Sequence, residues 1–317
     1  MLLNKVSFIG ADFEVGQTRK GLSESSDLFI EYLKTYQHFF GLNFEKKGQV
    51  KLEIQSQPVA CFSISDLINL NFNKYEELCL LTGDSIKGQK QCLNFGGDHS
   101  IALSTIEATL RHYPSTHVIW IDAQADANSV EASVSGNFHG MPVFYLMQQL
   151  QQRPLAMSWM QTTLKPEQLT YIGLRDLDAF EIELLAKNNI KYFTVLDIKK
   201  SGLQSVLSYL EEKNKSFEQI HLSFDIDSMD PVYGLCTGVP VKDGLSLEDV
   251  EKIFSLVNSS GKLINADFVE VNPNMAKSFS ELHHIYFTAL HLLHILFNEK
   301  SLSQQFSKEP HCDFIHD

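Results

Sequence analysis

The sequence predicts a doubly wound α/β domain built around a mainly parallel sheet. Strand-like segments alternate with segments of helical period along nearly all of the 317 residues. The run His117–Ile121 is continuously apolar, as in a strand that is buried on both faces. No linker, internal repeat or low-complexity stretch divides the chain, so we expect a single domain over residues 1–317.

The predicted strands are short apolar runs that end at glycine, proline or polar residues. Val6–Ala11 opens into a loop punctuated by glycine, and a Gly-Gly pair follows Phe95. The predicted strands are Val6–Ala11, Val50–Ile54, Gln91–Phe95, His117–Ile121, Leu169–Gly173, Lys191–Val195, His221–Phe224 and Ile264–Val271.

The predicted helices carry apolar residues at helical spacing, and some begin at a capping residue. Ser65-Asp66 is a cap for the second helix, and Ser246 with Asp249 three residues on is close to a capping box. The predicted helices are Ser26–Phe40, Leu67–Lys87, Ile101–Tyr113, Ala179–Asn188, Leu203–Lys213, Leu247–Ser259 and Ser278–Phe297. The polar tail after Ser301 is expected to be loose.

Composition narrows the class of protein. The chain is 44% hydrophobic with 22 Phe, enough for a large core, and 21% charged, which is ordinary for a soluble protein. Its net charge is −13 and it has no basic stripe, so nucleic acid is not an expected partner. An acidic surface suits a small cationic substrate.

Cysteine usage and hydropathy predict a cytoplasmic protein. The 5 cysteines are odd in number and form no C-x-x-C pair, which argues against a disulfide framework or a thiolate zinc site. The first residues lack the apolar run of a signal peptide. No stretch approaches the roughly 20 apolar residues of a membrane helix, so no membrane association is expected.

Two carboxylates follow the predicted strand His221–Phe224. In an extended chain Asp225 and Asp227, at positions i and i+2, point to the same side. Half-buried carboxylates held side by side repel unless a cation lies between them or one is protonated. Asp230-Pro231 is expected to end the strand, because proline cannot donate to a ladder.

Other polar groups also follow predicted strands, where parallel sheets bind their ligands. His99 comes after the Gly-Gly pair, and His139 lies between glycines. Asp122, Gln124 and Asp126 recur at i, i+2 and i+4, so an extended chain would direct all three one way. Singly, such residues are more often caps or solvated turns. Together, carboxylates with one imidazole and no cysteine suit an ion such as Mn²⁺, and paired ions generate hydroxide near neutral pH.

Ordered sequence blocks make a family resemblance specific. They are GADFEVGQTRKG (10–21), GGDHS (96–100), DAQADAN (122–128), SGNFHG (135–140), YIGLRDLD (171–178), SFDIDSMDP (223–231) and EVNP (270–273). With these blocks the chain resembles the arginases of the ureohydrolase family over nearly its full length. The first and last blocks favour arginase over agmatinase or formimidoylglutamase.

The resemblance implies a three-layer α/β/α fold and two Mn²⁺ ions that share Asp122 and Asp225. His99 and Asp126 would complete the shell of the first ion, and Asp227 would bind the second. In the family a metal-bridging hydroxide attacks the guanidinium carbon of L-arginine, and urea and L-ornithine leave. The resemblance also implies a homotrimer or a hexamer.

The resemblance also assigns roles around the ions. Asp126 would orient the hydroxide, His139 would shuttle a proton with a near-neutral pKa, and Glu270 would face the guanidinium group. The groups that would grip the α-carboxylate and α-amino ends of the substrate are Asn128, Ser135, Asn137 and Asp178.

Two positions depart from the family pattern. Gln124 replaces a histidine ligand of the second ion, and a neutral amide oxygen is a poorer Mn²⁺ ligand than imidazole. The second ion is therefore expected to bind weakly. Val239 replaces a threonine that contacts substrate, and it keeps the shape without the hydroxyl, so a smaller loss is expected.

The sequence therefore predicts an Mn²⁺-dependent arginase, a hydrolase acting on linear amidines. Gln124 and Val239 leave open a non-catalytic arginase-like protein with a binding or regulatory role. Hydrolysis of another guanidine, such as agmatine, is a further alternative. Asp176 and Asp178 favour a substrate that bears an α-amino group.

Overall fold

All strands in the described part of the chain belong to one eight-stranded sheet, in the order β2-β1-β3-β8-β7-β4-β5-β6. The computed structural model describes residues 5–52, 63–67, 70–233 and 236–298. Every pairing between these strands is parallel, which confirms the predicted α/β class. The tail after residue 301, predicted to be loose, lies outside the described residues.

The six inner strands are buried except at Gln219 of β7, whereas the two edge strands are partly exposed. The strands are β1 (Val6–Phe13), β2 (Phe44–Leu52), β3 (Cys92–Phe95), β4 (Thr116–Ile121), β5 (Leu169–Leu174), β6 (Lys191–Thr194), β7 (Gln219–Asp225) and β8 (Leu263–Val269).

Helices follow most strands, as the alternation predicted. They are α1 (Ser25–Tyr36), α2 (Ile64–Leu67), α3 (Phe72–Ile86), α4 (Ala102–His112), α5 (Pro142–Met147), α6 (Ala179–Lys187), α7 (Val195–Ser201), α8 (Gln204–Asn214), α9 (Leu247–Ser259) and α10 (Phe279–Phe297). Short 3-10 helices lie at Leu22–Glu24, His99–Ile101, Phe138–Gly140, Leu150–Gln152, Leu155–Met157, Pro166–Gln168, Ile226–Ser228 and Pro273–Met275.

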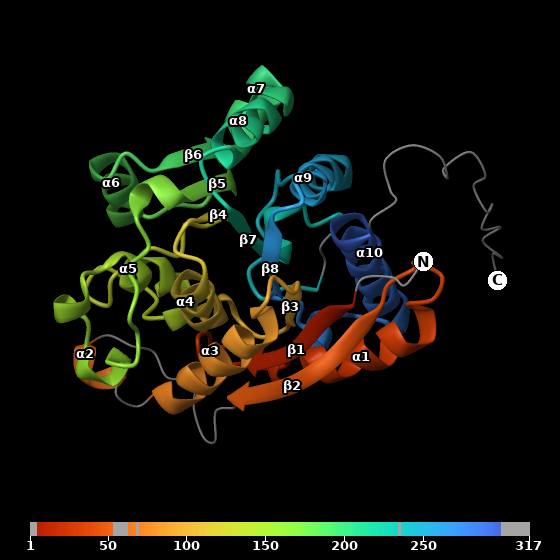
Figure 1. Ribbon diagram of the computed structural model, residues 1–317, viewed down its shortest axis with the longest axis horizontal. Helices are drawn as coiled ribbons and strands as arrows, with labels where there is room; N and C mark the ends of the chain where they lie inside the picture. The colour runs from red at the N-terminus through yellow and green to blue at the C-terminus, as the bar shows by residue number, and fades with distance from the viewer. Residues whose placement is uncertain (1–4, 53–62, 68–69, 234–235, 299–317) are drawn as a thin grey trace.

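Two helical layers enclose the sheet, giving three layers in all (Figure 1). The helices α1, α7, α8, α9 and α10 pack on one face, where Phe29, Phe254 and Leu293 are fully buried. The helices α3, α4, α5 and α6 pack on the other face, around Tyr75 and Trp120. The two large apolar cores hold the sheet rigidly between them.

Some predicted boundaries were wrong. The helix expected from Leu67 begins at Phe72, after the shorter α2. The strand expected to reach Val195 ends at Thr194, whose hydroxyl accepts a hydrogen bond from Asp197 N (3.0 Å) and so starts α7. This capping pair is a local helix signal that outweighs the β-propensity of valine.

The strand order brings distant loops together. β7 and β8, the last two strands in the chain, lie between β3 and β4. Because all the strands are parallel, the loops that follow β3, β4, β7 and β8 leave the same edge of the sheet. This central position is where open α/β sheets form ligand sites.

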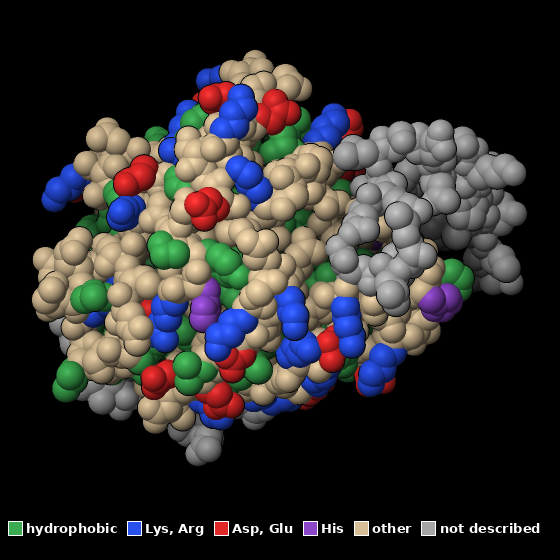
Figure 2. All heavy atoms as spheres, in the orientation of Figure 1, with side chains coloured by type: hydrophobic (Ala, Val, Ile, Leu, Met, Phe, Trp, Pro, Cys, Tyr) green, Lys and Arg blue, Asp and Glu red, His purple; other side chains and the backbone are tan. Residues whose placement is uncertain are grey.

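The visible surface carries mixed charge (Figure 2). The lysines of β2 are paired with acids: Lys47 with Glu45 (2.6 Å) and Lys51 with Asp27 (2.8 Å). Within the described residues no helix has the length and apolar character to cross a membrane. Cys79, Cys92 and Cys236 are buried free thiols, and the other two cysteines lie outside the described residues.

Gly97, in the loop that follows β3, provides a test of the packing between this loop and β1. Its φ is +77°, and an added Cβ would overlap the carbonyl oxygen of Ala11 in β1. We expect Gly97→Ala to lower the free energy of unfolding by about 2–5 kcal/mol, from left-handed strain plus overpacking. Gly88 is a matched control, with a φ of +72° and no atom within 4 Å of an added Cβ.

Gly88→Ala should cost only about 1 kcal/mol, because it adds strain without overlap. Urea denaturation of both variants measures the difference. Equal losses at the two positions would contradict the packing argument.

Candidate metal centre and substrate pocket

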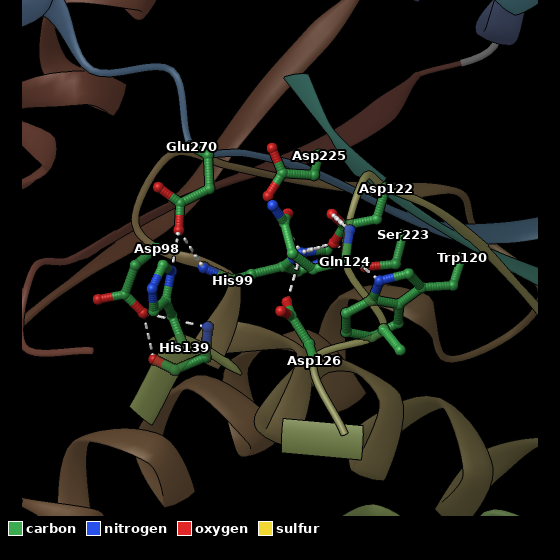
Figure 3. A network of polar contacts seen from close by, with 12 residues as sticks. Asp98, His99, Trp120, Asp122, Gln124, Asp126, His139, Ser223, Asp225 and Glu270 are labelled. Carbon is green, nitrogen blue, oxygen red and sulfur yellow. Dashed lines mark hydrogen bonds and ion pairs between the residues drawn. The ribbon is translucent and has the colours of Figure 1, made fainter. Parts of the chain in front are cut away.

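His99 lies at the centre of a buried group of carboxylates. Its Nδ1 is 2.9 Å from Asp122 Oδ2, 3.1 Å from Asp126 Oδ2 and 3.3 Å from Asp225 Oδ2 (Figure 3). The imidazole is fully buried, and this nitrogen makes no hydrogen bond of acceptable geometry with the described residues. An unsatisfied nitrogen surrounded by carboxylate oxygens is the arrangement of a cation site rather than of a hydrogen-bond network.

The spacing of these atoms fits a divalent ion. Adjacent ligands of an octahedral ion, with bonds of about 2.1 Å, lie about 3 Å apart. The other ring nitrogen of His99, Nε2, lies 2.9 Å from Ser223 Oγ. Such a contact fixes the orientation of a ligating imidazole. His99, Asp122, Asp126 and Asp225 thus have the chemistry and the spacing to hold one ion.

A second group of possible ligands shares two of these residues. Atoms of Asp122, Asp225 and Asp227 lie within 4.8 Å of one another, and all three residues are buried. Asp227 N donates to Asp225 Oδ1 (2.8 Å). The strand ends at Asp225, and a 3-10 turn over Ile226–Ser228 follows it. The expectation that Asp230-Pro231 ends the strand was wrong, and the two carboxylates meet through this turn.

Burial makes the charge of this cluster costly. Burial and, next, the charge of Asp122 raise the pKa of Asp225 to about 8 and that of Asp126 to about 6. Burial and the charge of Asp225 raise the pKa of Asp227 as well. A divalent cation would offset this repulsion, because it favours the ionised form of every carboxylate around it.

The segment from Asp122 to Asp126 is bent rather than extended. β4 ends at Ile121, and Asp126 has a φ of +49° in the left-handed region. This left-handed conformation turns the Asp126 side chain toward His99, where it meets Asp122. The two carboxylates are therefore close because the backbone turns, and the predicted alternation along an extended chain was wrong. Gln124 takes a different direction: its Nε2 donates to Asp176 Oδ2 (3.2 Å).

Glu270 and His139 lie beside the cluster. Glu270 Oε1 accepts a hydrogen bond from His99 N (3.0 Å) and lies 2.9 Å from His139 Nδ1. Its Oε2 accepts one from Gln17 Nε2 (2.5 Å). Glu270 has a φ of +63°, a strained conformation typical of functional positions. Gln17 was noticed only as part of a sequence block, and no local pattern indicated this contact.

The pKa of His139 is higher than the near-neutral value expected. Burial alone would lower it, but the hydrogen bond and charge of Glu270, and the charges of Asp126 and Asp98, raise it to about 9. A cation bound near Asp126 would oppose this rise. His139 is therefore placed to hold a proton next to Glu270.

A pocket of about 240 Å³ opens onto the cluster. Asn128 Nδ2 donates to Asp178 Oδ2 (2.9 Å) at its wall. The residues singled out in the sequence that line it are Gln124, Asp126, Asn128, Ser135, Asn137, His139, Asp176, Asp178, Asp225, Asp227, Val239 and Glu270. Neutral amides and hydroxyls thus share the wall with carboxylates, which suits a ligand that carries both signs of charge.

Glu181 is a pocket residue that the sequence reasoning missed. Its carboxylate accepts hydrogen bonds from the backbone N of Ala127 (3.0 Å) and of Asp178 (3.0 Å). Burial raises its pKa to about 7. Glu181 lies three residues after Asp178, at the start of α6, so the spacing of a capping box could have identified it from the sequence.

Arg175 is the second residue whose role was missed. Its guanidinium donates to the carbonyl oxygens of Asp227 (2.6 Å), Ser228 (3.1 Å), Val241 (2.8 Å) and Lys242 (3.1 Å). These bonds tie the turn that bears Asp227 to the loop after Val239. Five donors in a planar fork make this possible, and lysine cannot reproduce it.

We expect Arg175→Lys to lower the free energy of unfolding by about 2–3 kcal/mol, because buried carbonyl groups lose their donors. Thermal or urea unfolding measures the loss. Arg19 is exposed, so Arg19→Lys is the matched control and should change stability little. An unchanged stability in Arg175→Lys would show that water replaces these bonds.

The site consists of buried carboxylates and one imidazole at the carboxyl edge of a parallel sheet, and it opens to a polar pocket. This arrangement is typical of a metal-dependent hydrolase. The profile of the arginase family matches residues 4–291. Mitochondrial arginase-2 of Bos taurus is 34% identical over 286 residues, covering 88% of this chain and 80% of that protein.

Solved arginase structures have the same fold. The arginase of Bacillus subtilis superposes with a TM-score of 0.81 at 28% identity, covering 94% of this chain and 100% of that one. The Entamoeba histolytica arginase, in complex with L-ornithine, gives 0.80 at 30% identity, with 94% and 99% covered. The chain belongs to the arginase family, whose members are metal-dependent ureohydrolases.

Proposed function

We propose that this protein is an arginase that hydrolyses L-arginine to L-ornithine and urea with two Mn²⁺ ions. The observation that carries the proposal is His99 Nδ1, buried and unsatisfied among three carboxylate oxygens at 2.9–3.3 Å. Carboxylates with a single imidazole and no thiolate are the donor set that Mn²⁺ accepts.

Six residues would hold the ions. His99, Asp122, Asp126 and Asp225 would bind the first, and Asp122, Asp225, Asp227 and Gln124 the second. When bound, such a pair lowers the pKa of water and supplies hydroxide near neutral pH. Gln124, which has no titratable donor, makes the second ion the weaker one.

The remaining residues would bind and protonate the substrate. The Glu270 carboxylate would accept hydrogen bonds from the guanidinium group, in a charge-assisted contact. Asp126 would orient the hydroxide toward the guanidinium carbon. His139, 2.9 Å from Glu270, would give its proton to the leaving amine of ornithine.

The outer pocket would grip the amino-acid end. Asn128, Ser135 and Asn137 offer amide and hydroxyl donors for an α-carboxylate, and Asp178 offers an acceptor for an α-ammonium group. All four line the same pocket as Glu270. An L-arginine molecule that spans the pocket would thus place its guanidinium group against Glu270 and its α-ammonium group against Asp178.

Urea release tests the proposal. The metal-free protein should release none, and added Mn²⁺ should restore release from L-arginine at a rate well above that from agmatine, which lacks the carboxylate. Asn137→Ala should raise KM for L-arginine about 10- to 100-fold, because a hydrogen bond to a charged group is lost. It should leave agmatine turnover unchanged.

Absence of urea at saturating Mn²⁺ and alkaline pH would reject the proposed arginase activity. If agmatine is hydrolysed at a comparable rate and Asn137→Ala has no effect, hydrolysis of another guanidine, such as agmatine, is favoured instead.

A non-catalytic role is the alternative that Gln124 and Val239 motivate. Two tightly bound ions per chain would count heavily against it. A cytoplasmic location and a homotrimer or hexamer are further predictions, which fractionation and light scattering would test.

A further inference from the structure

The two groups of possible metal ligands differ in their chemistry. The imidazole subsite comprises His99, Asp122, Asp126 and Asp225. The oxygen subsite comprises the carboxylates of Asp122, Asp225 and Asp227, and we assign to it the amide of Gln124, which lines the same pocket. Only the first contains a nitrogen donor, because the second is made of carboxylates and one amide. The difference is one of donor type, and donor type governs which cations a site prefers.

The contact between Gln124 and Asp176 determines which amide atom is available. A carboxylate can only accept hydrogen bonds, so the Gln124 nitrogen must face Asp176, at 3.2 Å. The amide oxygen is then left free of that contact. Gln124 also lines the pocket together with Asp225 and Asp227. Any bond from Gln124 to a cation therefore comes from its carbonyl oxygen.

Both subsites reach the pocket. Asp126 and Asp225 of the imidazole subsite line it, as do Asp225, Asp227 and Gln124 of the oxygen subsite. His99, the nitrogen donor, is fully buried and does not belong to the pocket wall. The subsites therefore differ in their donors and not in their access to solvent.

Bonds to the backbone support the oxygen subsite in this position. Asp122 Oδ1 accepts from Gln124 N (2.8 Å), and Asp225 Oδ1 accepts from Asp227 N (2.8 Å). Arg175 holds the carbonyl oxygen of Asp227 at 2.6 Å. The oxygen donors are thus set by the backbone of two tight turns, so the subsite would exist before an ion arrives.

We propose that the two subsites differ in cation preference: the imidazole subsite, which also accepts Mn²⁺, has the higher relative affinity for Zn²⁺, whereas the oxygen subsite favours hard ions such as Mn²⁺, Mg²⁺ or Ca²⁺. The inference rests on the two-ion centre of the proposed function. Imidazole favours Zn²⁺ and similar ions, whereas carboxylate and carbonyl oxygens favour Mg²⁺, Ca²⁺ and Mn²⁺. When Zn²⁺ and Mn²⁺ compete, the imidazole subsite would therefore hold the larger share of Zn²⁺.

Anomalous diffraction can measure this selectivity at each subsite. Crystals of the metal-free full-length protein are equilibrated with equal concentrations of Mn²⁺ and Zn²⁺. Data collected at the two absorption edges give the Zn²⁺ to Mn²⁺ ratio at each position. We expect this ratio to be lower at the oxygen subsite than at the imidazole subsite, on the order of tenfold.

Two substitutions at one position separate selectivity from affinity. Gln124→His adds a nitrogen donor and should remove the difference between the subsites. Gln124→Glu adds a charged oxygen donor, so it should tighten binding at the oxygen subsite and keep the low Zn²⁺ to Mn²⁺ ratio.

Asp176→Asn should weaken ion binding at the oxygen subsite, because an asparagine side chain can also donate hydrogen bonds and no longer fixes the orientation of the Gln124 amide. Asp178→Asn loses the same charge without the Gln124 contact and is its control.

Equal metal ratios at the two subsites, or the same ratio in Gln124→His and Gln124→Glu, would overturn the inference. Such a result would leave the proposed function intact, since urea release depends on filled sites and not on their preferences. A protein that fills both subsites selectively but releases no urea would reject the proposed function and keep the inference. No binding of either ion would reject both.

Discussion

Asp225→Asn should abolish the response of the protein to Mn²⁺. Asp225 Oδ2 lies 3.3 Å from His99 Nδ1, and Asp225 also belongs to the second ligand group. An asparagine keeps the shape but places an amide where both ions need a carboxylate. We expect turnover of L-arginine to fall by at least about a thousandfold, which corresponds to about 4 kcal/mol.

The same substitution should not weaken the metal-free fold. It removes a carboxyl group whose ionisation is already disfavoured, since burial raises the pKa of Asp225 to about 8, from a buried cluster that also contains Asp122, Asp126 and Asp227. At an Mn²⁺ concentration of 100 times Kd, the wild-type protein should gain about 2.7 kcal/mol of stability. The variant should gain none, while its metal-free melting temperature stays equal to or above that of the wild type.

Asp12→Asn is the matched control for this experiment. Asp12 is a buried carboxylate of β1 that accepts hydrogen bonds from Ser26 N (2.8 Å) and Gln49 Nε2 (2.6 Å), outside the metal cluster. Its asparagine variant should keep the Mn²⁺ response in calorimetry. An Asp225→Asn protein that still gains stability with Mn²⁺ would contradict the shared-carboxylate assignment.

Glu270→Gln should separate substrate binding from metal binding. The side chains have the same shape, so the positive φ of +63° and the contact with Gln17 can persist. The lost charge removes the charge-assisted bonds to the guanidinium group and the carboxylate beside His139. We expect kcat/KM for L-arginine to fall about a hundredfold or more, with unchanged metal content.

L-Ornithine provides the control ligand, because it has the amino-acid end of arginine without the guanidinium group. Its inhibition constant should be unchanged in Glu270→Gln and should rise in Asn137→Ala. Metal content by mass spectrometry and inhibition kinetics complete the test. Lost metal in Glu270→Gln, or equally weakened L-ornithine binding, would show that Glu270 acts through the fold and not through the guanidinium contact.

Local sequence information was sufficient for most of the elements. α9 has the predicted bounds, because Ser246 and Asp249 form the expected capping box. The buried strand β4 was evident from its continuous apolar run. Polar residues after β3, β4 and β7 indicated the edge of the sheet at which a site would form. Each of these signals depends on residues within a few positions of one another.

The contacts within the site depend on distant residues and could not be found in this way. Gln17 and Glu270 are 253 positions apart, and they meet because β1, β3 and β8 are neighbours in the sheet. Arg175 reaches carbonyl groups 52 to 67 positions away. No local pattern reports such pairs, because strand order is set by which apolar faces are buried together.

The sequence by itself determined the parallel α/β class, the kinds of side chain that gather at its edge and the replacement of a histidine donor by Gln124. The tertiary structure decided which of those side chains meet. The left-handed φ of Asp126 and the turn after Asp225 place carboxylates around His99. Backbone conformation and strand order act over the whole chain, whereas residue type and spacing describe only its neighbourhood.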